Sequence, residues 1–404
     1  MHTVWRVVAG ALLSAICACA ASNFPEDPLK NPGFVYFYNL EYTQAIDTFA
    51  REVKDDPSNP RTYNHLAQAI LYREMFRNGA LESQLVTGSN PFLRQPKMRI
   101  SAEDRSRFFD CINRSLALTQ ATLATNANDV PALYSNGAAH ALRATFLFLV
   151  EKAWVDSLKD ASADRNASHR ILEADPKFID AHFALGLYDY VVGNLSFFMR
   201  ALSFVGGFRG DKAGGIRQIE EVNRSGIGAR YDAQILLAVI YRRERRPLDA
   251  MPLLKNLAET FPRNYLFRFE QVQMYSDLGD KNAALRVIGE IEDLRRTKAP
   301  GYADLAQERV AFLRGNLLFW YRDFPAALQD LKTVALHPDR VPFSTAVLAQ
   351  LRVGQLYDIM GDRDRAVVAY RSTIDMASGS EIAAEARSYI EKPYRRKDFP
   401  SDGR

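Results

Sequence analysis

The chain has 404 residues, is 47% apolar and 25% charged, and carries a formal net charge of +4. This balance is typical of folded protein and excludes a chain that is disordered throughout. The positive charge is too small to indicate nucleic-acid binding. Length alone suggests two or three globular domains, but repeat arrays grow in one direction without a central core, so repeats have to be sought first.

Residues 1–21 have the pattern of an export signal. A weakly basic start precedes the apolar stretch Val7–Ile16, and Ala18–Ala20 form a small-residue cleavage site. The apolar stretch is short for a membrane span, so we expect cleavage, a mature chain that begins near Ala21, and a periplasmic or other extracytoplasmic location. In a second interpretation the residues up to Cys19 resemble a lipoprotein box, with a lipid anchor on Cys19. In a third, the segment stays in place as an uncleaved anchor.

The decisive feature is a spacing of large and small apolar residues that returns after about 34 residues. In residues 231–262 it comprises Leu237, Ala238, Tyr241, Ala250, Leu254, Leu257 and Pro262. The next unit has Tyr275, Gly279, Ala284, Ile288 and Ile291. Two further units are marked by Gly315, Ala327, Leu331 and Val334, and then by Gly354, Tyr357, Gly361, Ala366 and Tyr370. Four consecutive units are therefore visible.

This spacing resembles that of the tetratricopeptide repeat, a pair of antiparallel helices. The small residues allow the two helices to approach closely, and the proline ends the second helix. The resemblance implies an all-α solenoid, a right-handed superhelix of about seven to eight helix pairs. Strands are not expected, because period-two alternation is absent.

The repeats divide the chain into parts of different regularity. After the signal, residues 26–230 are expected to form irregular repeats with insertions, residues 231–380 regular repeats, and residues 381–404 a terminal helix and a basic tail that is frayed from Pro393. In the irregular part, Ser101–Thr125 reads as one long helix capped by Ser101. The helix that contains Gly137 is expected to continue to Trp154.

An apolar insertion interrupts one of the irregular units. Residues 194–208 are rich in large side chains, which are Phe197, Phe198, Leu202, Phe204 and Phe208. The segment needs a cover, because burying each large side chain is worth about 1.5–3 kcal/mol. It can fill the interior of the superhelix, dock on a membrane or a partner, or line a site for a small ligand.

The turn that follows this insertion carries a second resemblance. The run Val205-Gly206-Gly207-Phe208-Arg209-Gly210-Asp211-Lys212 looks like a segment of the eukaryotic tetratricopeptide family associated with the mitochondrial outer membrane. The likeness covers residues 181–245 and implies a non-enzymatic adaptor near a membrane. The export signal departs from that family and argues against a mitochondrial location.

Motifs for chemistry are weak in this sequence. Gly206–Ala213 lacks the spacing and the hydroxyl residue of a phosphate-binding loop. The histidines are scattered without metal-ligand spacing, and Cys111 lies among apolar residues at helical spacing, as a buried thiol would. We therefore expect neither enzyme activity nor a cofactor or metal.

The remaining candidate site is the concave groove, into which four positions of each first helix point. The candidate residues for contact with a partner are Ile235, Val239, Arg242, Phe269, Gln273, Arg309, Phe312, Asn316, Phe319 and Gln355. Aromatic, amide and basic groups suit the binding of a peptide. The basic run Tyr241–Arg246 is either a solvated helix end or a preference for acidic partners. The sequence thus predicts an exported scaffold that binds partner proteins and can associate peripherally with a membrane. The alternative is an extracytoplasmic protein that binds a small molecule or lipid through residues 194–208.

Overall fold

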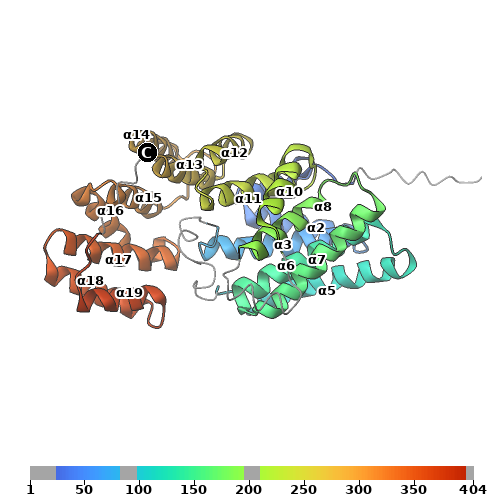
Figure 1. Ribbon diagram of the computed structural model, residues 1–404, viewed down its shortest axis with the longest axis horizontal. Helices are drawn as coiled ribbons and strands as arrows, with labels where there is room; N and C mark the ends of the chain where they lie inside the picture. The colour runs from blue at the N-terminus through green and yellow to red at the C-terminus, as the bar shows by residue number, and fades with distance from the viewer. Residues whose placement is uncertain (1–23, 82–97, 195–209, 397–404) are drawn as a thin grey trace, which may run out of the picture.

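The structure is a computed structural model that describes residues 24–81, 98–194 and 210–396 (Figure 1). Every regular element in these ranges is helical. Eight antiparallel helix pairs follow one another, and a last helix closes the array, as the repeat spacing predicted. The pairs are α1 (Pro32–Tyr38) with α2 (Tyr42–Asp55), α3 (Pro60–Arg77) with α5 (Ala102–Thr125), α6 (Val130–Phe146) with α7 (Trp154–Ala174), α8 (Ala181–Gly193) with α10 (Lys212–Ser225), α11 (Arg230–Arg243) with α12 (Pro247–Thr260), α13 (Tyr265–Asp277) with α14 (Lys281–Arg296), α15 (Gln307–Trp320) with α16 (Phe324–Leu336), and α17 (Phe343–Ile359) with α18 (Arg363–Met376), followed by α19 (Glu381–Glu391). We number them pairs 1 to 8.

The residues that define the repeat form the contacts inside and between the pairs. In pair 5, Leu237, Ala250 and Leu257 are fully buried. The same holds in later pairs for Ala284, Ile291, Ala327, Leu331, Val334 and Ala366. Each second helix therefore buries one stripe against its partner and the next pair, which is the usual source of helical stability.

Glycine is required where two helices of a pair touch. A Cβ built on Gly354 in α17 would lie 2.5 Å from the ring of Tyr370 in α18. In pair 4, a Cβ on Gly186 would lie 2.7 Å from the carbonyl oxygen of Gly215. The backbones can approach this closely only because neither position carries a side chain.

In pairs 5 to 8 the turn inside the pair uses a left-handed residue, and this residue is glycine only in pairs 6 and 8. Gly279 and Gly361 have φ of +80° and +82°, which is the role that the repeat predicts for glycine. Arg245 and Arg322 take φ of +57° and +63° in the corresponding turns of pairs 5 and 7. The turn therefore keeps its left-handed conformation in pairs whose sequence has no glycine at this position.

The region around residue 150 differs from the sequence prediction. The helix with Gly137 does not continue to Trp154: α6 ends at Phe146, a π-helical turn (η3, Leu147–Glu151) follows, and Lys152 has φ of +58°. Trp154 instead begins α7. The chain reverses here so that α7 packs antiparallel to α6; Ser157 donates a hydrogen bond to the carbonyl oxygen of Ala144 at 2.9 Å. The sequence did not reveal this turn, because the apolar residues continue through it without a break.

The two ends of the array lie apart in Figure 1, with α5 to α8 at one end and α17 to α19 at the other. One hydrophobic cluster nevertheless joins helices that are distant in sequence. It includes Phe37 and Tyr38 of α1, Leu237 of α11, Phe261 at the end of α12 and Phe267 of α13. The first pair therefore packs against the middle of the array as well as against its neighbour.

Candidate functional site

The first five predicted groove residues lie in the first helices of pairs 5 and 6, α11 and α13. Ile235 and Val239 of α11 are half-buried. The side chain of Arg242 is 8% exposed and forms ion pairs with Glu270 at 3.6 Å and Asp277 at 3.1 Å. It also donates a hydrogen bond to Gln273 at 2.9 Å. The polar groups at this position are therefore bonded to one another.

The aromatic groove residues lie inside the packed structure. Phe269, Phe312 and Phe319 are at most 3% exposed. Asn316 and Gln355 are buried as well. These positions build the solenoid wall, and little of their surface is left for a partner. Their role in partner contact stays a prediction.

Arg309 links distant parts of the inner surface. Its guanidinium lies 5.2 Å from the ring centroid of Phe76 at the end of α3, and 5.3 Å from that of Tyr265 in α13. Cation–π contacts of this kind contribute on the order of 1 kcal/mol. The residue predicted for partner contact thus connects pairs 2, 6 and 7.

A segment from the start of the described chain packs across several helix pairs, and we call residues 24–41 the strap. Near its beginning, the Phe24 ring contacts Tyr134 of α6 and Phe178 before α8, each at a centroid distance of 5.5 Å. The guanidinium of Arg61 lies 5.1 Å from the centroid of Phe24. A Cβ on Gly228 would lie 3.3 Å from Pro25. The beginning of the strap therefore crosses the N-terminal ends of four first helices.

The end of the strap is held by hydrogen bonds to pairs 5 and 6. The Tyr38 hydroxyl donates to Asp232 at 3.0 Å, and Asn264 donates to the Tyr38 carbonyl oxygen at 2.8 Å. The backbone N–H of Arg263 donates to Asn39 at 3.0 Å, and its guanidinium binds both carboxylate oxygens of Glu41 at 2.8 and 2.9 Å. These contacts hold the first pair against pairs 5 and 6.

The strap could not be predicted from the sequence because the hydrogen-bond partners that hold its end are more than 190 residues away in the chain. One local signal was available. The first helix, Pro32–Tyr38, carries Phe34, Tyr36, Phe37 and Tyr38 and has no charged residue. A helix that is apolar on all sides is expected to be buried. The first helix of an open solenoid would have one face in water, so this composition indicates additional packing.

Two aspartates, Asp232 and Asp164, have raised pKa values. Burial raises the pKa of Asp232 to about 6; the hydrogen bond from Tyr38 opposes this shift, and the charge of Asp180 adds to it. Burial also raises the pKa of Asp164 in α7 to about 7. Asp180 itself accepts hydrogen bonds from the backbone of Ile227, Gly228 and Ala229, and so orders the connection between pairs 4 and 5.

The edge that carries the turns inside pairs 5 to 8 exposes one large apolar side chain per pair; we call it the turn edge. These residues are Leu248, Leu278, Trp320 and Met360, which are 72%, 39%, 41% and 49% exposed. Successive first helices run in parallel, so their turns follow one another along one side of the array. Leu278, Trp320 and Met360 lie at the ends of first helices, and Leu248 lies at the start of the second helix α12. Single exposed apolar residues are ordinary, but four of them beside the turns of successive pairs make a candidate interaction surface.

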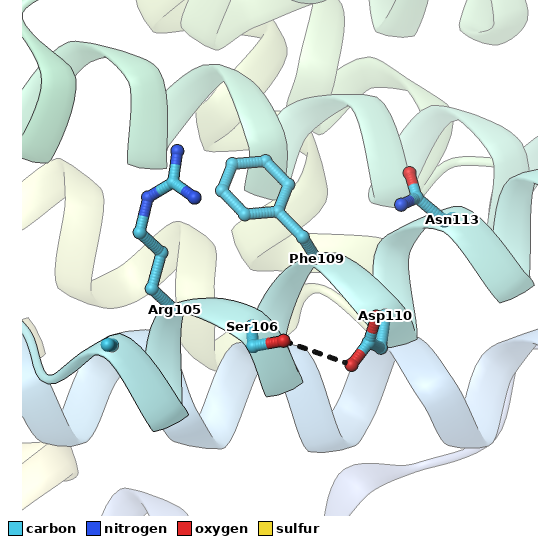
Figure 2. Close-up of a pocket in the computed structure, with 6 residues that line it drawn as sticks. Arg105, Ser106, Phe109, Asp110 and Asn113 are labelled. Atoms are coloured by element: carbon cyan, nitrogen blue, oxygen red, sulfur yellow. Dashed lines mark hydrogen bonds between the residues drawn. The ribbon is translucent and has the colours of Figure 1, made fainter.

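Figure 2 shows a pocket of about 350 Å³ along α5. Its lining comes from that one helix. Arg105 lies over the Phe109 ring and binds Glu151 at 3.0 Å, while Ser106 faces Asp110 at 3.5 Å. The polar groups named here thus contact one another or Glu151 within the chain.

A second pocket, of about 340 Å³, lies where the chain beyond α19 meets pairs 7 and 8. The tail was expected to fray from Pro393, but residues 393–396 are docked here. Tyr394 donates its backbone N–H to Asp358 at 2.7 Å, and Arg396 donates to the carbonyl oxygens of Phe319 and Trp320 at 3.0 and 2.7 Å. A cation at the C-terminal end of α15 satisfies carbonyl groups that the helix leaves open.

Several other predictions can be placed as well. Cys111 is buried, and burial raises the pKa of its thiol to about 11, which suits a packing role. Cys19 and the insertion residues Phe197, Phe198, Leu202, Phe204 and Phe208 lie outside the described residues. Within residues 24–81, 98–194 and 210–396, no group of three or more histidine, cysteine or carboxylate side chains could hold a metal ion. No helix in the described part of the chain has the length and apolar character to cross a membrane.

Comparisons with known proteins concern the fold. No protein-family profile matches the sequence, and no curated protein sequence matches it. Solved structures with a similar arrangement are yeast Tom70 (13% identity, TM-score 0.42, 91% of this chain and 89% of that chain), the human IFIT1 dimer with m7Gppp-AAAA (12%, 0.46, 91% and 83%) and a tetratricopeptide repeat protein from Parabacteroides merdae (10%, 0.32, 90% and 97%). At these values we take nothing about function from them. In fold, the chain is a solenoid of the tetratricopeptide-repeat type.

Proposed function

We propose that this chain is an exported, non-enzymatic scaffold that binds partner proteins along its solenoid surface, at an envelope membrane. The observation that carries the proposal is the turn edge, where Leu248, Leu278, Trp320 and Met360 are all at least 39% exposed in four successive pairs. Residues 1–21 support export. The predicted groove gives less support to partner binding, because many of its side chains are buried against other residues of the chain.

The alternative of a small-molecule or lipid site depends on residues 194–208, of which the structure describes only Asn194. The turn edge therefore remains the better supported binding surface. Its residues lie at helix ends beside the turns of packed helix pairs, so a partner would meet an ordered surface.

Affinity capture from native envelope, after cross-linking to the tagged full chain, tests the proposal. We expect the same partner with wild type and a loss of most of it with the triple variant Leu248→Ser, Leu278→Ser, Met360→Ser. The matched control is Val155→Ser, Leu336→Ser, Val368→Ser, whose positions are 65%, 71% and 66% exposed elsewhere. Equal recovery by both variants would rule out the turn edge, and no reproducible partner would rule out the scaffold.

The export step has its own measurement. Sequencing the N-terminus of the chain isolated from cells should give a start near Ala21, and labelling with a fatty acid should show whether Cys19 is lipidated. A chain that keeps Met1 in the cytoplasm would contradict export.

A further inference from the structure

The contacts of Phe24 form a cradle for an aromatic ring, which we define as Arg61, Tyr134 and Phe178. The Phe24 ring meets Tyr134 edge to face at 79° and lies tilted by 30° to Phe178. The guanidinium of Arg61 completes the enclosure at 5.1 Å. Aromatic and cation–π contacts in this geometry favour a planar ring over an aliphatic side chain.

The cradle is built on a rigid base. Tyr134 and Phe178 contact each other at 5.5 Å, and buried Leu133, Ile171 and Ala181 pack behind them in one cluster. The three cradle residues come from three successive repeats: α3, α6 and the connection before α8. Their positions are therefore fixed by the stacking of the pairs rather than by the strap.

The occupant of the cradle is held less firmly than the rest of the strap. The hydrogen bonds of Asp27 close a short turn within the strap, from the backbone of Leu29 and Lys30. Within the described residues, the strap's hydrogen bonds to other helices begin at Asn31, which donates to Glu52 at 2.9 Å, and reach Asp232 and Asn264 at the buried Tyr38. Residues 24–30 can therefore leave while the first pair stays packed, because local openings involve the segments with the fewest buried contacts.

We propose that the cradle is a recognition site for an aromatic side chain on an extended segment of a partner protein, and that Phe24 occupies it within the same chain. This inference rests on the proposed scaffold function and names the chemistry of one contact. A tethered occupant has an effective concentration in the millimolar range, so it holds off a partner segment until that segment binds more tightly or is itself linked to a second contact.

Fluorescence anisotropy with a labelled, acetylated peptide of residues 24–31 tests the inference on the full chain. Phe24→Ala vacates the cradle and should bind this peptide at least about tenfold more tightly than wild type, because competition within the chain is lost. Leu29→Ala, a change at an exposed position of the same strap, should behave as wild type. A peptide in which serine replaces the phenylalanine should not bind to Phe24→Ala.

The cradle itself is tested by adding Arg61→Ala to Phe24→Ala, which should weaken peptide binding several-fold and leave the circular dichroism spectrum unchanged. The inference is overturned if Phe24→Ala binds no more tightly than wild type, or if the serine peptide binds equally well. Failure of the scaffold is a separate result: envelope capture would then recover no partner although the peptide still binds to Phe24→Ala.

Discussion

At the level of single residues, the contact of Gly354 with Tyr370 shows how little space the pairs leave. We expect Gly354→Ala to lower the free energy of unfolding by about 1–3 kcal/mol, because the new methyl group meets a fully buried ring at 2.5 Å. Gly289→Ala in α14 is the matched change, since no atom lies within 4 Å of its Cβ position. It should raise stability by about 0.5–1 kcal/mol. Urea unfolding measures both, and a similar sign for the two would contradict the packing argument.

The raised pKa values of Asp164 and Asp232 predict a pH dependence of stability. An aspartate in the unfolded chain has a pKa of about 3.9. Folded Asp164 and Asp232 keep their protons up to about pH 7 and 6. Between pH 4 and 7 the folded state therefore binds more protons, and this contribution to stability falls as the pH rises.

The difference between wild type and the double variant Asp164→Asn, Asp232→Asn isolates that contribution. Asparagine keeps an acceptor for the hydroxyl of Tyr38 and does not titrate. Relative to wild type, the variant should gain stability from pH 4.5 to 7.5 in urea unfolding. A difference that stays constant with pH would show that these carboxyl groups have ordinary pKa values in the folded chain.

At the level of helices, α6 and α7 are joined by a charged cluster. Asp160 accepts hydrogen bonds from Arg143 at 2.6 and 2.7 Å and contacts His140 at 2.7 Å. Burial opposes the shift, but these hydrogen bonds lower the pKa of Asp160. Asp160→Ala should cost about 3 kcal/mol, because it leaves the partly buried guanidinium of Arg143 without its carboxylate partner.

The exposed ion pair of Lys159 with Asp156 is the comparison for this prediction. Both side chains are more than 60% exposed, so Asp156→Ala should change stability by less than about 0.5 kcal/mol. Chemical unfolding of the two variants gives the two numbers. Equal losses would mean that burial of the cluster contributes nothing.

Helices were predictable from the sequence where their stripes repeat, and less so where they do not. Ser101 caps α5 as predicted, with its Oγ accepting from the N–H of Asp104 at 3.0 Å. The end of α6 was not predictable, because the apolar run from Phe146 to Val150 continues into the turn without a polar residue or glycine to mark it. Arg245 and Arg322 show the same limit, since nothing in the sequence marks them as left-handed.

At the level of the whole molecule, the strap joins the first pair to pairs 5 and 6. Arg263→Ala removes the bidentate contact with Glu41, and we expect faster amide exchange in both α1 and residues 261–266. Arg268→Ala is the control, because its partners Glu290 and Tyr302 belong to pair 6 and the connection that follows it. If amide exchange rises only beside residue 263, the packing of the first pair against pairs 5 and 6 does not depend on this contact.

The sequence by itself determined the helix pairs, because the repeat places small and large residues where two helices must touch. It also determined that Cys111 and the stripe residues such as Leu331 would be buried. Only the tertiary structure decided which inner surface is covered and which edge is open. A repeat pattern describes contacts between neighbours in the chain, whereas Tyr38 with Asp232 and Arg396 with α15 are contacts across the curve of the solenoid. They depend on how far the array bends, and that is the sum of many small rotations between pairs.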